Sequence, residues 1–190
     1  MELALFGRHF LEFAMIYPGA YLCLAPLQGH LREPRKTYAL AAAAITAVCL
    51  FCSAVCTIFE LSSNTLLLPI LIAAFWLLRW RTGPGVSVSQ TAFLFSIAAV
   101  MMAVCTLLAV VLNARAEAGN NSDAFLVETS VVGLLLSVLL SAAFRLTAVR
   151  WSIWLLQEYR GEAFWQSAWP LPALYAAYLV FCMPKDISIV

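Results

Sequence analysis

Two acidic residues inside apolar stretches are the strongest candidates for chemistry in this chain of 190 residues. Glu12 lies in the stretch 10–27, and Glu128 lies near the start of the stretch 125–144. An ionised carboxylate is costly at membrane depth unless it is paired, so such acids are functional candidates. The alternative is that each acid lies about one helical turn below a membrane surface, where it reaches water and has no special role. The sequence leaves both interpretations open.

Arg8 and His9 are the nearest candidate partners of Glu12. Arg8 precedes Glu12 by four residues, the spacing of an ion pair on a helix, although the order Glu before Arg is the more favourable one. Such a pair would neutralise the carboxylate. The two histidines, His9 and His30, are predicted on opposite sides of a membrane, and so they cannot bracket one haem or one metal ion.

Cys49, Cys52 and Cys56 have the spacing of one helix face. A Cys-x-x-Cys pair suggests redox or metal chemistry, and the membrane version would be a quinone-coupled disulfide enzyme. Such an enzyme needs thiols that meet a soluble partner, whereas all six cysteines lie inside apolar stretches. Structural disulfides in exported domains form where oxidant has access. We therefore expect a packing face of small, polarisable side chains, with no disulfide and no metal.

Sequence motifs of the common enzyme classes are absent. The chain has no Gly-x-Ser-x-Gly, no phosphate-binding Gly-Lys-Ser/Thr loop and no His-Glu-x-x-His. A formal net charge of +1, without a patch that mixes basic and aromatic residues, gives no reason to expect nucleic acid as a partner. We expect no catalytic residue, no cofactor and no enzymatic activity in this chain.

The composition places these residues in a membrane. Hydrophobic residues make up 64% of the chain and charged residues 11%, against roughly 45–50% and 25% in soluble domains. A soluble domain of this length could not cover so much apolar surface, whereas lipid accepts it. We expect an all-α, polytopic helix bundle in a membrane, such as a bacterial plasma membrane, with the lipid bilayer as its first partner.

Six stretches are long enough, or nearly so, to cross a bilayer as helices. Pro18-Gly19 should kink the first, and Pro170 with Pro172 should break the last. The stretch 145–162 mixes basic residues with tryptophans, which suits a helix at the interface with Trp165 and Trp169 as further anchors. We predict one domain, 1–190, with spans at about 10–27, 38–59, 62–78, 89–112, 125–144 and 163–183.

The basic loops predict the orientation. Short loops rich in Lys and Arg stay on the cytoplasmic side. With the stretch 28–37 inside, eight of the eleven basic residues fall in the inner segments 28–37, 79–89 and 145–162. Both termini are then outside. If 62–78 were re-entrant, every later loop would change sides and the basic residues of 145–162 would lie outside.

Most acidic residues fall on the predicted outer side. Such a rim could attract a cationic or peptide ligand. The alternative is that acids collect where basic residues are excluded. Glu12, Glu60 and Glu128 are our candidate ligand-binding residues on this side.

The C-terminal stretch resembles a known family. The residues Trp-Pro-Leu-Pro at 169–172, an apolar helix, and Phe-Cys-Met-Pro-Lys-Asp-Ile-Ser at 181–188 are similar to the end of the penultimate span in the sensor region of agr-type quorum-sensing histidine kinases with GHKL domains. The resemblance implies a receptor that senses an extracellular peptide and passes a shift in helix packing to a cytoplasmic kinase. In that family one further span and the kinase follow; these 190 residues contain neither.

Two functions therefore stay open. The first is a multi-pass sensor module of a two-component signalling system, without its own catalysis, with an extracellular peptide as ligand and a second copy of the chain as a partner. The second is a small transporter or permease component in which Glu12 or Glu128 binds a proton or cation. No internal repeat supports an inverted-repeat transporter.

Overall fold

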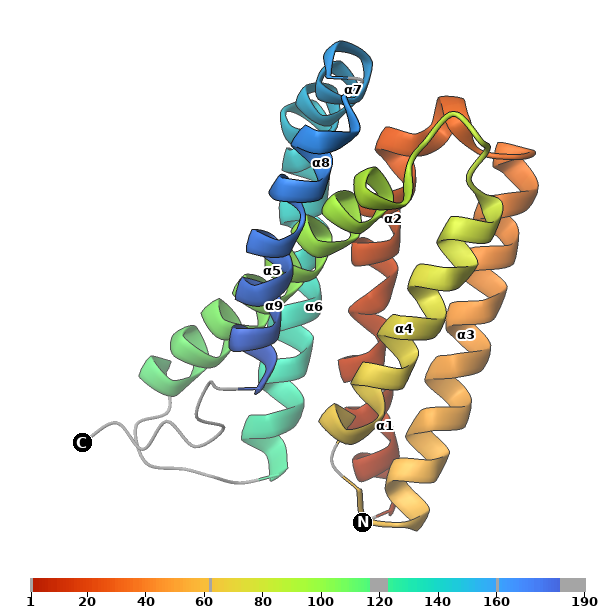
Figure 1. Cartoon of the computed structure of the whole chain (residues 1–190). Coiled ribbons are helices and arrows are strands. Elements are labelled where there is room, and N and C mark those ends of the chain that lie inside the picture. The colour runs from red at the N-terminus through yellow and green to blue at the C-terminus, as the bar shows by residue number, and fades with distance from the viewer. Residues whose placement is uncertain (1, 62, 117–122, 160, 182–190) are drawn as a thin grey trace.

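The computed structural model describes residues 2–61, 63–116, 123–159 and 161–181, and these residues form an all-helical fold (Figure 1). Outside the helices, the described ranges contain one isolated β-bridge, between Leu31 and Thr82. The elements are α1 (Glu2–Ala14), α2 (Ile16–Leu27), the 3₁₀ turn η1 (Gln28–His30), α3 (Pro34–Ile58), α4 (Ser63–Arg81), α5 (Val88–Ala116), α6 (Asp123–Leu146), α7 (Ala148–Glu158), α8 (Glu162–Ala168) and α9 (Pro170–Phe181).

Three helical segments of the described chain are long and apolar enough to cross a membrane. They are 5–30, 34–58 and 88–109. A fourth is added if 130–146 and 149–158, which bend by 47° against each other, count as one span. The predicted all-α fold is confirmed for the described residues, which contain three to four candidate membrane spans where six were predicted.

Two helix breaks occur at a fixed distance before a proline. Helix α1 ends at Ala14, four residues before Pro18, and α8 ends at Ala168, four residues before Pro172. A proline ring clashes with the carbonyl of the residue four positions earlier. The first break therefore lies at Met15, not at the predicted Pro18-Gly19, which are both inside α2.

The helices pack in two groups that meet along α1 and α2. Helix α1 contacts α3 and α6, and α2 contacts α5 and α6, while α9 packs along α5. Figure 1 shows α3 and α4 on one side of α1–α2, and α5, α6 and α9 on the other. Small residues allow the close approaches: a Cβ on Gly133 of α6 would lie 3.3 Å from Met15 Cε and 3.4 Å from Ala109 Cβ.

The connectors alternate between two ends of the molecule. The connectors 28–33 and 82–87 lie together at the end drawn uppermost in Figure 1, which we call the basic end. The turn between α3 and α4 and the start of α6 lie at the opposite end. At the basic end, Ser87 and Gln90 exchange hydrogen bonds, Ser87 N–H to Gln90 Oε1 (2.8 Å) and Gln90 N–H to Ser87 Oγ (3.2 Å). This capping box begins α5.

The cysteines take the predicted packing role in the described part of the chain. Cys49, Cys52 and Cys56 are buried in one cluster with Phe13. Cys23 and Cys105, like these three, are buried and have free thiols. Cys182 lies outside the described residues.

One predicted membrane anchor is instead a core residue. Trp165 is 1% exposed, and its ring lies 5.3 Å from that of Phe93 in an edge-on contact. Trp151, Trp154 and Trp169 are exposed. The interfacial interpretation is wrong for Trp165 because α8 turns this side chain onto α5. Helix α4 also continues to Arg81, three residues beyond the predicted end of the third span.

Candidate functional site

A polar network on α1 surrounds Glu12. Arg8 Nε donates to Glu12 Oε1 at 3.0 Å, which confirms the predicted i,i+4 pair. The other carboxylate oxygen, Oε2, lies 3.3 Å from His9 Nδ1. The three side chains lie on one face because the spacing 8, 9 and 12 returns to it after one helical turn. The carboxylate is paired on its own helix.

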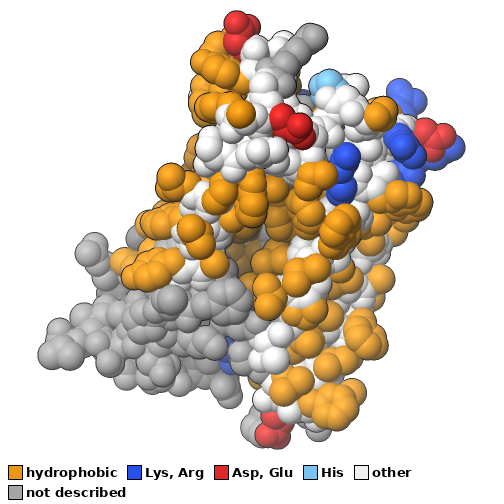
Figure 2. Space-filling view, viewed as in Figure 1, with side chains coloured by type: hydrophobic (Ala, Val, Ile, Leu, Met, Phe, Trp, Pro, Cys, Tyr) orange, Lys and Arg blue, Asp and Glu red, His pale blue; other side chains and the backbone are white. Residues whose placement is uncertain are grey.

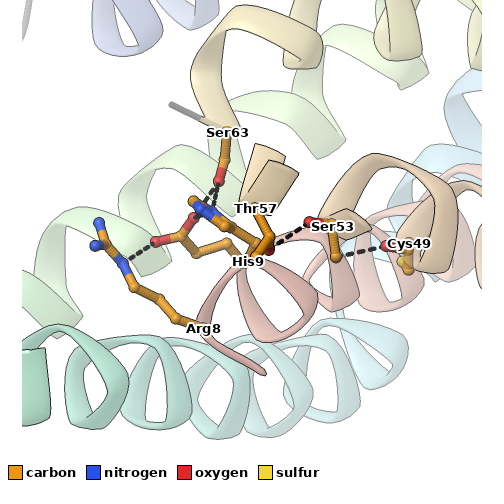
Figure 3. A network of polar contacts seen from close by, with 7 residues as sticks. Arg8, His9, Cys49, Ser53, Thr57 and Ser63 are labelled. Atoms are coloured by element: carbon orange, nitrogen blue, oxygen red, sulfur yellow. Dashed lines mark hydrogen bonds and ion pairs between the residues drawn. The ribbon is translucent and has the colours of Figure 1, made fainter. Parts of the chain in front are cut away.

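Ser63 connects this network to the first turn of α4. Its Oγ donates to Glu12 Oε2 and lies 2.7 Å from His9 Nδ1. Figure 3 shows Ser63 pointing toward the His9 ring and the carboxylate that Arg8 contacts from its other side. A contact between residues 51 positions apart thus ties α1 to α4 through ionisable side chains.

The network is partly shielded from the surroundings. His9 is 5% exposed, and the side chains of Arg8 and Glu12 are each 27% exposed. Arg8 Nε and Ser63 Oγ donate to different oxygens of the Glu12 carboxylate, so this acid is both paired and hydrogen-bonded at a partly buried position.

Ser63, His9 and Glu12 are the residue types of a hydrolase triad, but not its geometry. In a triad the acid and the nucleophile bind opposite nitrogens of the imidazole, so that one orients the base for the other. Here Ser63 and Glu12 both approach Nδ1. Glu12 is therefore not placed to orient the imidazole for Ser63, as the acid of a triad would be.

Helix α3 presents a face of small residues beside this site. Ser53 Oγ donates to the carbonyl of Cys49, and Thr57 Oγ1 donates to the carbonyl of Ser53 at 2.8 Å (Figure 3). Hydroxyls that bond within their own helix need no partner on a neighbour. This lets α1 pack closely on α3.

The other two predicted ligand residues do not join the network. Glu60 is exposed in the turn after α3, and Glu128 is exposed on α6. Neither has a hydrogen bond or ion pair to Glu12 in the described part of the chain. All three belong to the end of the molecule opposite the basic end (Figure 1).

Two cavities of the described structure lie away from this network. One of about 60 Å³ lies between α2, α5 and the α6–α7 bend, and one of about 300 Å³ lies between α5 and α9. Apolar side chains line the larger one, including Phe93, Met101 and Tyr175. Among the described residues no group of three or more His, Cys, Asp or Glu side chains could hold a metal ion.

Sequence reasoning identified Glu12 and Arg8 but gave no role to Ser63. A serine at the start of a helix carries no signal of its own, because its partner is 51 residues away and the pairing depends on how α4 packs against α1. His9 was detectable by its position beside Arg8, within one turn of Glu12. The spacing alone could not show which of its ring nitrogens would face the acid.

No protein-family model, no curated protein and no solved structure matches this chain.

Proposed function

We propose that this chain is a non-catalytic membrane sensor module with six spans and both termini outside. The network of Arg8, His9, Glu12 and Ser63 is then an outer-side contact that a ligand can open. The function resembles that of the sensor region of agr-type histidine kinases, which the residues at 169–188 imply. Residues 182–188 of that resemblance lie outside the described ranges.

Helix lengths support the six-span count. Helix α4 has 19 residues, and α8 and α9 together have 19 (7 + 12). At about 1.5 Å per residue each would extend roughly 28 Å, close to the ~30 Å hydrocarbon thickness. The alternation of connectors between two ends, with the basic loops at one of them, agrees with the orientation that the charges predict.

The observation that carries the sensor proposal is the ionisable contact between α1 and α4. Intramembrane ionisable groups are functional candidates, and this one joins two helices that are not neighbours in sequence. A cationic ligand that contacts Glu12 would compete with Ser63 and His9 for the same carboxylate oxygen. Loss of that contact would shift the packing of α4 against α1, because a ligand favours the arrangement to which it binds better.

Spin labels on α1 and α4 test this proposal. Leu3 and Thr65 are both exposed, and Leu3→Cys with Thr65→Cys would report the separation of the two helix ends. We expect externally added trilysine, compared with triglutamate at equal ionic strength, to shift the label distance by about 1–2 Å, the size of a helix shift. Glu12→Gln should abolish the shift.

Glu158→Gln, at an exposed position on α7, is the matched control and should keep the response. Equal responses to the two peptides, or a trilysine response that survives Glu12→Gln, would contradict the proposal.

A proton-coupled transporter is the second candidate. The observation in its favour is the contact of His9 Nδ1 with Glu12, a pair that can hold a proton inside an apolar helix. It predicts substrate-linked proton uptake by reconstituted vesicles that disappears in Glu12→Gln or Glu128→Gln. Flux that is unchanged in both variants would remove this candidate and leave the sensor proposal untouched.

A further inference from the structure

The two connectors at the basic end are joined into one unit. Arg32 N–H donates to the Arg81 carbonyl at 3.0 Å, and Gly83 N–H donates to the His30 carbonyl at 2.8 Å. These bonds flank the β-bridge between Leu31 and Thr82. The backbones of the two connectors, and with them the helix ends that carry the basic side chains of α3 and α4, are therefore held together.

Arg81 is part of that framework. Its Nε donates to Thr37 Oγ1 at 3.1 Å, and its Nη2 donates to the Arg32 carbonyl at 3.0 Å. Its Nη2 also lies 3.9 Å from Glu33, and the guanidinium lies 5.8 Å from the centre of the Trp80 ring. With 17% of its side chain exposed, Arg81 is occupied by protein partners.

Two other arginines are not occupied. Arg32 and Arg35 are exposed, and within the residues that the structure describes their guanidinium groups have no hydrogen bond and no ion pair. Lys36 Nζ pairs with Glu33 at 2.9 Å, and this ammonium holds the pKa of Glu33 below its usual value. Five cations (Arg32, Arg35, Lys36, Arg79 and Arg81) against one acid (Glu33) leave a net charge of +4 (5 − 1).

An exposed apolar surface on α4 leads to this cationic group. Leu68, Ile72, Trp76 and Trp80 recur every four residues, and each is between 48% and 64% exposed. Figure 2 shows basic side chains gathered with an acidic one at the basic end, next to hydrophobic side chains that continue along the molecule. The two surfaces together have the polarity of a phospholipid, with a charged head above an apolar tail.

We propose that the basic end of α3 and α4 is a binding site for one anionic phospholipid of the inner leaflet. Its phosphate would lie between Arg32 and Arg35, where arginine offers the forked donors that phosphate accepts. Its acyl chains would lie along Trp76, Ile72 and Leu68. Basic sites between helices on the cytoplasmic side bind such head groups. The proposal rests on the membrane placement proposed above, but not on the sensor role.

Native mass spectrometry of the purified full chain can measure this binding, with dioleoylphosphatidylglycerol and dioleoylphosphatidylcholine as probes. We expect tighter binding of phosphatidylglycerol. Arg32→Gln and Arg35→Gln should each weaken it about fivefold, the effect of one surface cation. Binding of phosphatidylcholine should not change.

Arg150→Gln is the matched control, because Arg150 is an exposed arginine on α7 outside this surface. It should leave both affinities unchanged. Trp76→Ala should weaken the binding of both lipids alike, since it removes only acyl contact. Both arginine variants alter exposed side chains, so an unchanged melting temperature will confirm that they fold.

Three results would overturn the proposal. The first is equal affinity of the unmodified chain for the two lipids. The second is a loss in Arg150→Gln as large as that in Arg32→Gln. The third is full displacement of phosphatidylglycerol by millimolar inorganic phosphate, which would show a site for a free anion and not for a lipid.

Discussion

Glu60 has a backbone conformation that L-residues rarely adopt. Its φ is +51°, directly after the end of α3. The N–H of Leu61 reaches back to the carbonyl of Cys56 at 3.0 Å, the bond of a Schellman motif, in which this left-handed position is usually glycine. Helix α3 therefore ends with a strained residue, and Glu60 has a structural explanation that does not involve a ligand.

Glu60→Gly is expected to stabilise the fold by about 1 kcal/mol, because glycine has no Cβ to oppose this conformation. The free energy of unfolding in detergent micelles is the measurement. Glu60→Ala is the control: it removes the carboxylate but keeps the Cβ, so it should give little gain. Equal gains in both variants would show that the carboxylate, and not the backbone, is unfavourable.

Ser63 contributes through one hydroxyl. Ser63→Ala removes the contact to Glu12 and His9, and we expect a loss of about 0.6–1.7 kcal/mol, the range for hydrogen bonds between membrane helices. A double-mutant cycle with His9→Ala measures the coupling between the two residues. Additive losses would mean that the two residues are not coupled, contrary to the 2.7 Å contact of Ser63 Oγ with His9 Nδ1.

At the scale of elements, Trp165 fixes the turn between α7 and α8. Its Nε1 donates to the Tyr159 carbonyl at 2.7 Å, and its ring contacts Phe93 of α5 and Phe164. A single buried side chain thus holds the end of α7 and the start of α8 against α5. The position of α8 depends on this anchor, whereas α9 packs along α5 itself.

Two replacements of Trp165 should separate the contribution of its hydrogen bond from the contribution of its ring packing. Trp165→Phe keeps most of the ring and loses the hydrogen bond, at a cost of about 1 kcal/mol. Trp165→Ala also leaves a cavity and should cost about 3–5 kcal/mol. Denaturant titration in micelles measures both, with Trp154→Phe at a half-exposed site as the near-neutral control. A near-zero effect of Trp165→Ala would show that α8 is not held by this side chain.

Prolines determine where two of the helices are interrupted. Pro18-Gly19 and Pro170 with Pro172 predicted interruptions in the stretches 10–27 and 163–183, and the described helices are interrupted in both. A proline ring clashes with the carbonyl of the residue four positions earlier. Each helix ends at that residue, so each break lies a few positions before the proline itself. The capping box of Ser87 and Gln90 was also readable as Ser-x-x-Gln, and would have placed the start of α5 within one residue.

For the whole molecule, the orientation in the membrane is the property on which the proposed function depends. Gly29 and Glu60 are exposed in turns at opposite ends (Figure 1). We expect an impermeant thiol reagent to label Glu60→Cys in intact cells, and Gly29→Cys only after the membrane is opened. The five native cysteines of the described residues are buried, and Cys182→Ser in both variants completes an unlabelled background. Labelling of Gly29→Cys alone in intact cells would reverse the orientation.

The sequence by itself determined the helical class, the apolar character, the two broken helices and the pairing of Arg8 with Glu12. These depend on composition or on neighbours within about one helical turn, where spacing sets geometry. Only the tertiary structure brought Ser63 to Glu12, buried Trp165 and joined the connector that carries Arg32 to the end of α4 at Arg81. Such contacts link residues far apart in the chain, and they form only where whole helices pack against each other.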